Sequence, residues 1–379
     1  MAQARRLVID ARRLAAGRTG LGRYLETLLR DWSMAGWPVP EVVPVLQDPG
    51  GLDLLPADLA GRTVVVGAGW PGLVWERLGL GRVLRRGDLL FAPTNLIPGN
   101  WRGPTVLVAF DTLLEVAPDG FPRTARWRFR SRYRSAARRA DRLIVPSDAT
   151  GRDVVRHYKV DPGRVRTIYP TVGDEFRPRP PDDPLVAGAR AWAGVGEGPF
   201  FLFVGKRSRR RNVPAILAAF RLHRGRHPRS RLVFVGPDGG TGVAADDSGG
   251  VVVAGHVADD LLLGLLSGAA GCLYPSEYEG FGLPVVEAMA SGCPVVTLRN
   301  SALVESGGEA ALFLERADPE ALAAAMDRLA GDDPTREARV RLGLAQARRF
   351  RGPGGSLAVR DEIRAVAAGT ALAPGPSRR

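Results

Sequence analysis

The stretch Tyr274-Pro-Ser-Glu-Tyr-Glu-Gly-Phe-Gly-Leu-Pro-Val-Val-Glu-Ala-Met-Ala-Ser-Gly292 joins an expected strand to an expected helix. Pro284 suits the first turn of a helix, where its missing N–H group costs nothing. Gly280 and Gly282 let the backbone come close to a ligand. Because the unpaired N–H groups of a helix start attract negative charge, the turn before this helix is a candidate anion site.

Two carboxylates frame this turn. Glu287 is expected in the first helical turn, where it would repel a phosphate but could accept hydrogen bonds from neutral hydroxyls such as a ribose diol. It could equally do no more than cap the helix dipole. Glu279 comes just before the glycines and could face a sugar. A glycine-rich turn before a helix is a weak signal by itself.

Short β-branched runs alternate with helical stretches along the whole chain, which predicts doubly wound parallel sheets in an α/β fold. The proline-rich segment 177–184 suits neither a central strand nor a helix interior, so it is expected to be a linker. We expect Rossmann-like domains at 1–178 and 185–352, followed by a last helix and a disordered tail at 353–379. The expected strands are 7–10, 42–46, 63–67, 89–92, 106–111, 143–146, 165–169, 200–205, 232–236, 251–255, 271–275, 294–298 and 311–314.

A basic loop follows the strand that ends at Gly205, with five cationic side chains among six residues. Lys206 and Arg211 flank the carboxyl end of this strand, where a departing diphosphate would need positive charge. Arginine can hold a phosphate through two parallel hydrogen bonds. The alternative is a solvated basic loop.

The charge of the chain is uneven. It carries 53 basic and 40 acidic side chains over 379 residues, a formal net charge of +13, and residues 1–180 hold 29 of the basic and 18 of the acidic ones. The segment from Arg123 to Arg142 contains nine arginines and one aspartate. It could be a solvated helix packed on the sheet, dock on anionic lipid, or attract an acidic acceptor. The chain shows no recognised nucleic-acid-binding motif, so no nucleic-acid partner is expected.

Several classes of protein are excluded. Cys272 and Cys293 are too few for a disulfide framework or a four-thiolate zinc site, and we expect them to be reduced. The sequence has no apolar run of 18 residues and no signal-peptide pattern, which predicts a cytoplasmic protein. His223 and His227 have the spacing of a metal pair, but Arg-Gly-Arg lies between them, which favours incidental surface histidines. We expect no metal and no cofactor.

The string EGFGLPVVEAMASGCPVV, in which seven residues separate Glu279 from Glu287, resembles the E-x7-E signature of the family 4, group 1, retaining glycosyltransferases. The basic loop resembles one that usually ends Arg-Lys-Asn, with Arg211 at the lysine position. The segment around His256 resembles the one that contacts the donor base. Gly20 and Gly22 resemble the glycine loop that follows the first strand. The resemblance covers nearly the full chain.

This resemblance implies the GT-B fold, in which two facing Rossmann-like domains enclose a cleft and the last helix crosses back to the first domain. It implies that Glu287 binds the nucleotide ribose and that Glu279 lies beside the transferred sugar. The other residues that it assigns to the nucleotide-sugar are Gly280, Phe281, Gly282, Leu283, Gly205, Gly20, Gly22 and His256.

One position departs from the family pattern. Members often have His-Asp at the end of a central strand of the first domain, and this chain has Phe110-Asp111. Asp111 could reach the acceptor or the sugar, or could be a turn residue. The Phe110 side chain cannot donate a hydrogen bond.

We therefore expect a retaining, metal-independent hexosyltransferase that moves a sugar from a UDP- or GDP-linked donor to a hydroxyl of a sugar, lipid-linked or small-molecule acceptor. Lys206, Arg211, Glu279 and Asp111 are its candidate catalytic residues. One alternative is a catalytically degenerate homologue that binds membrane or nucleic acid through its basic half. A phosphorylase that uses free phosphate is another. If the basic segment docks on lipid, the protein is peripheral on the inner face of the membrane.

Overall fold

The computed structural model describes residues 4, 6–14, 20–118, 123–196, 198–244, 250–331 and 334–370. Residues 371–379, the end of the segment predicted to hold the last helix and a disordered tail, lie outside these residues. The described chain divides into two compact units, residues 1–171 with 352–379, and residues 172–351. The passage between the units falls at Thr171–Val172, a few residues before the predicted linker at 177–184.

Each of the thirteen expected strands has a counterpart in the structure, with ends that differ by at most three residues. Most strands are buried throughout, because helices cover both faces of each sheet. The first unit contains β1 (Arg6–Asp10), β2 (Glu41–Leu46), β3 (Val64–Val65), β4 (Leu89–Ala92), β5 (Thr105–Val108), β6 (Arg142–Val145) and β7 (Val165–Thr167). The second contains β8 (Phe200–Val204), β9 (Arg231–Val235), β10 (Val251–Ala254), β11 (Gly271–Tyr274), β12 (Val295–Leu298) and β13 (Leu312–Leu314).

In the first unit the strands are parallel in the order β3-β2-β1-β4-β5-β6-β7. Alternate residues of β1 point to opposite faces, so Leu7 and Ile9 join one core and Val8 joins the other. The helices of this unit are α1 (Gly20–Ala35), α2 (Ala57–Ala60), α3 (Gly72–Val74), α4 (Gly81–Val83), α5 (Leu113–Val116), α6 (Arg123–Arg139), α7 (Asp148–Asp153) and α15 (Gly354–Ala367).

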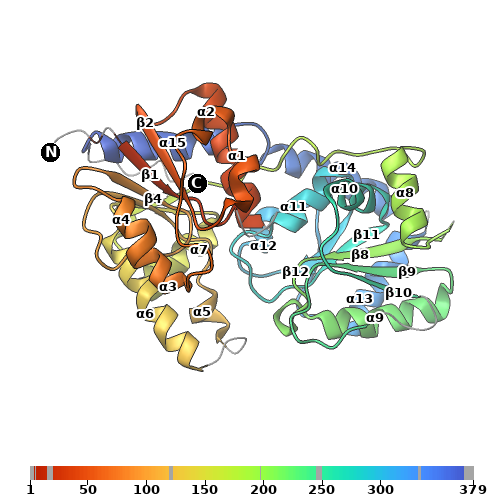
Figure 1. Cartoon of the computed structure of the whole chain (residues 1–379). Helices are drawn as coiled ribbons and strands as arrows, with labels where there is room; N and C mark the ends of the chain where they lie inside the picture. The colour runs from red at the N-terminus through yellow and green to blue at the C-terminus, as the bar shows by residue number, and fades with distance from the viewer. Residues whose placement is uncertain are drawn as a thin grey trace. The chain divides into compact units, whose positions relative to one another are not determined.

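The last described helix, α15, packs beside α1 on one face of the first sheet (Figure 1). Val359 and Ile363 share a core with Leu25 and Leu29 of α1. The backbone N–H of Ala4 donates to the carbonyl of Ala367, which ties the two ends of the unit together. The fold of the first unit therefore uses residues from both ends of the chain.

Most of the arginine-rich segment forms helix α6, and the segment covers the other face of this sheet through Ala136, Ala137 and, just after the helix, Ala140. Much of its charge is neutralised within the protein. Arg130 and Arg134 both pair with the buried carboxylate of Glu115. Other internal partners include Glu76 for Arg132, the Tyr158 carbonyl for Arg138, the Pro98 and Trp101 carbonyls for Arg139, and Glu362 for Arg142.

In the second unit the strands are parallel in the order β10-β9-β8-β11-β12-β13. Helices α9 and α13 lie side by side on one face, and α8, α10, α11 and α14 lie on the other (Figure 1). The helices are α8 (Pro184–Trp192), α9 (Val213–Arg226), α10 (Asp259–Gly268), α11 (Leu283–Ala290), α12 (Leu303–Gly307), α13 (Pro319–Ala330) and α14 (Pro334–Arg348). No helix among the described residues is long and apolar enough to cross a membrane.

Candidate functional site

The candidate site of the second unit lies where its strand order reverses. Strands β8 and β11 are neighbours in the middle of the sheet, although β9, β10 and the helices α9 and α10 separate them in sequence. The basic loop follows β8, and the glycine-rich turn follows β11, so both leave the carboxyl edge at the same place. Open α/β sheets bind their ligands at such a point.

Two glycines with positive φ and one buried arginine shape the basic loop. Gly205 has a φ of +136° and Gly236 has a φ of +120°, and a side chain on Gly205 would overlap the Arg211 guanidinium. Arg207 is buried and turns back into the sheet, where it donates to the carbonyls of Gly236 at 2.5 Å and Ala254 at 3.2 Å. The loop is therefore more than a solvated basic segment, because one of its five cations holds the strand ends together.

Glu279 is the centre of the most highly connected cluster in this site. Its Oε1 atom accepts from Arg211 Nε at 2.9 Å and from Arg210 Nη1 at 3.0 Å. The same oxygen accepts from the hydroxyls of Tyr274 at 3.0 Å and Ser276 at 2.9 Å. None of these four donors bonds to Oε2. One carboxylate oxygen is thus saturated by these four donors.

The charges of this cluster determine its protonation. Burial acts to raise the pKa of Glu279, but the charges of Arg211 and Arg210 and the hydrogen bonds from Arg211 and Ser276 lower it to about 2. Burial acts to lower the pKa of Arg211, but the Glu279 charge raises it above its ordinary value. The Arg211 guanidinium also lies 5.3 Å from the centre of the Tyr274 ring. Both members of the Glu279–Arg211 pair are therefore charged at neutral pH.

Sequence reasoning selected Glu279 and Arg211 but missed Arg210, Tyr274 and Ser276. Arg210 also donates to the Tyr278 carbonyl and to Ser276 Oγ at 2.9 Å, so it holds the turn as well as the carboxylate. The signal was present in the sequence as a second arginine beside Arg211. The sequence could not show that Arg210 reaches Glu279, because the basic loop and the glycine-rich turn come together only in the fold.

The turn before α11 has the geometry expected of a close backbone approach. Gly282 has a φ of +93°, and a Cβ atom there would lie 2.9 Å from Leu303 Cδ2, so only glycine fits. It precedes the first residue of α11, no side chain caps this helix start, and Pro284 lies in the first turn. The Leu283 amide therefore begins an uncapped helix N-terminus.

Glu287 is not in the first turn of α11, which corrects the sequence-based placement. The helix begins at Leu283, so Glu287 is its fifth residue, and the first turn contains no acidic residue. The Glu287 side chain is buried. A role as a simple cap of the helix dipole is thereby disfavoured, because the dipole acts mainly on the first turn.

The remaining predicted residues of this unit differ in exposure. Lys206 is exposed, and its carbonyl accepts from Arg211 Nη1 at 3.4 Å. Gly280 and Phe281 are buried, and the Phe281 ring packs edge-on against Phe350 at 5.1 Å. His256 is exposed in the loop after β10, two strands away from β8 at the edge of the sheet.

In the first unit the predicted glycines form part of a helix and not a loop. Gly20 is the first residue of α1, and Gly22 lies buried within its first turn. The segment 15–19, which includes Gly17, lies outside the described residues. The expectation of a loop at Gly20 and Gly22 is therefore wrong, because both glycines already belong to helix α1.

Asp111 and Phe110 follow β5 at the carboxyl edge of the first sheet. Asp111 Oδ1 accepts from the backbone N–H of Leu113 at 3.0 Å, as a turn residue does. Phe110 packs edge-on against the buried Tyr24 at 5.2 Å, and its N–H donates to Asn95 Oδ1 at 2.8 Å. The Phe110 ring therefore packs against the core of the first unit.

A charged network that sequence reasoning missed occupies the equivalent point of the first sheet, where its strand order reverses. Asp10 ends β1 fully buried, and Arg12 Nη2 donates to its Oδ2 at 2.5 Å. Arg12 also pairs with Glu76 at 2.9 Å, and the Thr94 hydroxyl donates to Asp10 at 3.1 Å. This network fixes the residues that follow β1 and β4.

Comparisons with known proteins agree with this architecture. The family model "Glycosyltransferase Family 4" matches residues 18–176, and the model "Glycosyl transferases group 1" matches residues 198–332. The O-antigen chain mannosyltransferase B of Escherichia coli is 30% identical over 226 residues, which are 55% of this chain and 56% of that protein. The D-inositol 3-phosphate glycosyltransferase of Acidothermus cellulolyticus is 32% identical over 229 residues, 56% of this chain and 50% of that protein. The chain thus spans about half the length of these curated relatives.

Solved structures share the fold over nearly the whole chain. Anabaena Alr3699/HepE in complex with UDP and glucose superposes with a TM-score of 0.72 at 18% identity, covering 95% of this chain and 98% of that one. The sucrose-phosphate synthase of Thermosynechococcus elongatus superposes with a TM-score of 0.74 at 19% identity, covering 97% and 100%. The fold is therefore GT-B. The two family models match successive parts of the chain, residues 18–176 and 198–332, and together they show that this protein belongs to the family 4, group 1 glycosyltransferases.

Proposed function

We propose that the protein transfers a hexose from a UDP- or GDP-linked donor to an acceptor hydroxyl with retention of anomeric configuration. The observation that carries the proposal is the cluster at the carboxyl ends of β8 and β11. There an uncapped helix start, a largely buried carboxylate and a guanidinium meet at the point where such sheets bind ligands. The relatives named above act on sugars, and the Anabaena protein was solved with UDP and glucose.

The diphosphate of the donor would lie against the Leu283 amide and the positive end of α11, where an anion is stabilised. Arg211 would stabilise the charge that develops on the leaving diphosphate. Its ion pair with Glu279 holds the guanidinium in place before substrate arrives, which is the condition for electrostatic catalysis. Lys206, on the exposed side of the same loop, would add a second, adaptable cation.

The sugar and the ribose would meet the two glutamates. Glu287 is buried along α11 behind the helix start, and a carboxylate there suits the two hydroxyls of a ribose. Glu279 has one oxygen saturated by the protein, so Oε2 is the atom that would accept from a sugar hydroxyl. The leaving phosphate would itself take the proton of the acceptor hydroxyl, which needs no further side-chain base and no metal ion.

A donor screen tests this proposal. UDP- and GDP-hexoses are added to the wild-type chain, and thermal stability and nucleotide release in the presence of sugar acceptors are measured. One donor should raise the melting temperature and be consumed, and Glu287→Ala and Arg211→Ala should each weaken donor binding about 10- to 100-fold, as loss of a hydrogen bond to a charged group does. Arg209→Ala, an exposed cation of the same loop, is the matched control and should change little.

Three outcomes would contradict parts of the proposal. No binding of any nucleotide-sugar would favour the degenerate homologue. Transfer that depends on free phosphate would identify a phosphorylase. A product with inverted anomeric configuration by NMR would refute retention while leaving the transferase activity intact.

We also propose that α6 carries the protein to an anionic membrane surface. Trp127 is 79% exposed, and it borders a groove of about 910 Å³ whose other lining residues are Arg126, Arg130, Ser131, Arg134, Ser135, Arg138 and Arg139. An exposed tryptophan among arginines suits the interface between water and anionic headgroups. The internal ion pairs described above reduce the net charge of this face, so we expect moderate binding.

Vesicle sedimentation provides the measurement for this second proposal. The wild-type chain should sediment with vesicles that contain anionic phospholipid and remain in solution with neutral ones, and high salt should release it. Combining Trp127→Ser with Arg126→Gln should weaken binding at least about fivefold, since each surface arginine contributes about 1 kcal/mol. Trp192→Ser, at a half-exposed tryptophan of the second unit, is the control. Equal binding to neutral vesicles, or none to either kind, would refute membrane docking.

A further inference from the structure

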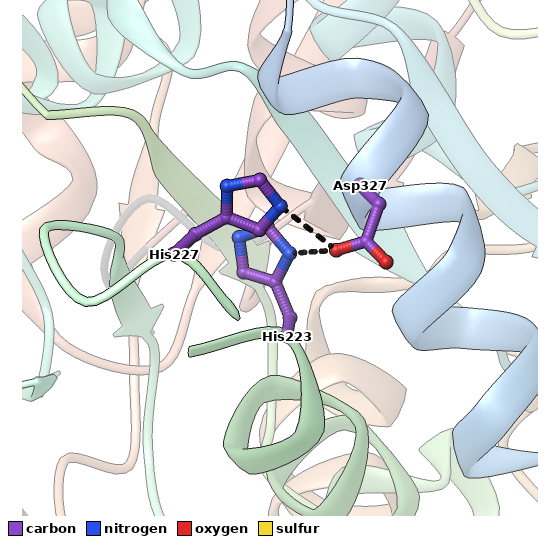
Figure 2. Close-up of side chains that lie close together, drawn as sticks. All are labelled: His223, His227 and Asp327. Carbon is purple, nitrogen blue, oxygen red and sulfur yellow. Dashed lines mark hydrogen bonds and ion pairs between the residues drawn. The ribbon is translucent and has the colours of Figure 1, made fainter. Parts of the chain in front are cut away.

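His223, His227 and Asp327 form a compact cluster in the second unit. His223 Nδ1 lies 2.6 Å from Asp327 Oδ1, and His227 Nε2 lies 3.3 Å from the same oxygen. Figure 2 shows both imidazole rings directed at this carboxylate, and their centres are 4.5 Å apart. The three ligand-type atoms all lie within 4.8 Å of one another. His223 is fully buried, so the expectation of incidental surface histidines is wrong for this residue.

The cluster is separate from the candidate glycosyltransferase site. Helix α9 begins after the basic loop and runs 14 residues to Arg226, with His227 just beyond its end. At 1.5 Å per residue, this places the cluster about 20 Å from the basic loop. Asp327 comes from α13, the helix beside α9, so the three side chains link two neighbouring helices.

The donor atoms are those that first-row transition metals prefer. Two imidazole nitrogens and one carboxylate oxygen suit Zn²⁺, which takes three protein ligands and leaves a fourth position to water in open sites. The side chains of His227 and Asp327 are 41% and 28% exposed, so an ion and its water ligand can reach them from solvent. Adjacent ligands of a tetrahedral Zn²⁺ at about 2.0–2.1 Å are about 3.3–3.4 Å apart, so only small side-chain movements are required.

Ser230 orients the buried imidazole of His223. His223 Nε2 lies 2.9 Å from the hydroxyl of Ser230, which is itself buried. With an ion on Nδ1, the ring proton resides on Nε2 and is donated to Ser230 Oγ. Metal-bound histidines are generally held by such a contact on their other nitrogen. Without an ion, the Ser230 hydroxyl donates to Nε2 and Nδ1–H donates to Asp327, so the change needs a tautomer shift of His223 and a turn of one hydroxyl.

Arg226 is the competitor for the carboxylate. Its Nε and Nη2 atoms donate to Asp327 Oδ2 at 3.1 and 2.5 Å, which leaves Oδ1 to the two histidines. The Arg226 side chain is 53% exposed and can swing into solvent. Its positive charge lowers the affinity of the site for a cation.

We propose that His223, His227 and Asp327 bind one zinc-type divalent ion that cross-links the end of α9 to α13. The ion would serve stability rather than transfer chemistry, because the cluster lies at the end of α9 opposite the basic loop. The predicted metal independence of the transferase reaction is unaffected by such a site.

Calorimetric titration with Zn²⁺ after removal of metals by chelator tests the proposal, with Co²⁺ absorption as a second readout of tetrahedral coordination. One ion should bind per chain, raise the melting temperature, and give the visible spectrum of tetrahedral Co²⁺. His227→Gln, at the exposed end of α9, should abolish binding at the concentrations used. Ser230→Ala should weaken it about 10- to 100-fold. His157→Gln, at a histidine of the first unit, is the matched control and should bind as the wild type does.

Arg226→Gln separates a metal site from a simple ion-pair network. If the cluster binds metal, removing the competing charge should tighten Zn²⁺ binding several-fold. If it is only an Arg–Asp–His network, Arg226→Gln should lower the melting temperature and create no Zn²⁺ binding. Absence of stoichiometric binding to the wild-type chain, or equal losses in His227→Gln and His157→Gln, would overturn the proposal.

Discussion

Replacing Glu279 with alanine is expected to destabilise the protein by about 3 kcal/mol or more, because two arginines lose their counter-charge. The Arg211 and Arg210 side chains are only 15% and 20% exposed, so water compensates little for the missing carboxylate. The Tyr274 hydroxyl loses its acceptor in the same step, and the Ser276 hydroxyl keeps only the Tyr278 carbonyl. The free energy of unfolding is measured by urea titration of wild type and variant.

The matched control is Glu277→Ala, two residues earlier and exposed. Substitutions at such surface positions typically change the free energy of unfolding by less than about 0.5 kcal/mol. The double variant Glu279→Ala/Arg211→Ala should be less destabilised than the sum of its two single variants, because it leaves one buried charge fewer unpaired. Equal effects of Glu279→Ala and Glu277→Ala would show that the cluster contributes nothing to stability.

The fold was predictable because its strands are buried on both faces. A strand such as Phe200–Val204 appears in the sequence as an uninterrupted apolar run, and the helices between such runs predict parallel order. The start of α1 was placed too late, because Gly20 and Gly22 have low helix propensity, and packing of Leu25 and Leu28 overrides it.

The site was predictable as two loops but not as a cluster. The turn and the basic loop each carried a local signal, and the strand order brings them together at β8 and β11. No local sequence pattern shows the direction in which each of the five cationic side chains of the basic loop points. Arg207 turns inward to carbonyls, whereas Arg211 turns to Glu279, and both follow from the paths of distant strands.

The arginines of α6 illustrate the same limit. In the sequence they form one basic segment, and its charge suggested a partner. In the fold, Glu115 and Glu76 approach from other elements and neutralise several of them. Charge patterning along a helix predicts which residues are polar, but it cannot predict the counter-ions that tertiary structure supplies.

Acid is expected to remove the stabilisation that Glu279 contributes, in the range from about pH 4.5 to pH 2. In the unfolded chain this carboxyl has its ordinary pKa of 4.5, whereas in the folded protein burial acts to raise the pKa but Arg211 and Arg210 lower it to about 2. Between these values the unfolded state binds a proton that the folded state does not. The free energy of unfolding therefore falls as the pH falls, by on the order of 3 kcal/mol across the range.

Comparison of wild type with Glu279→Gln isolates this contribution. Glu115 and Asp327 also have pKa values below their ordinary range, since hydrogen bonds from their arginine and histidine partners outweigh the opposing effect of burial, so they add to acid sensitivity in both proteins. The glutamine variant should be less stable at neutral pH but should lose less stability between pH 4.5 and pH 2, so the two curves converge as the pH falls. Glu277→Gln should run parallel to wild type throughout. If the curves of wild type and Glu279→Gln stayed parallel, Glu279 would not be held as a carboxylate by its arginines, and the electrostatic preorganisation proposed for Arg211 would lose its physical basis.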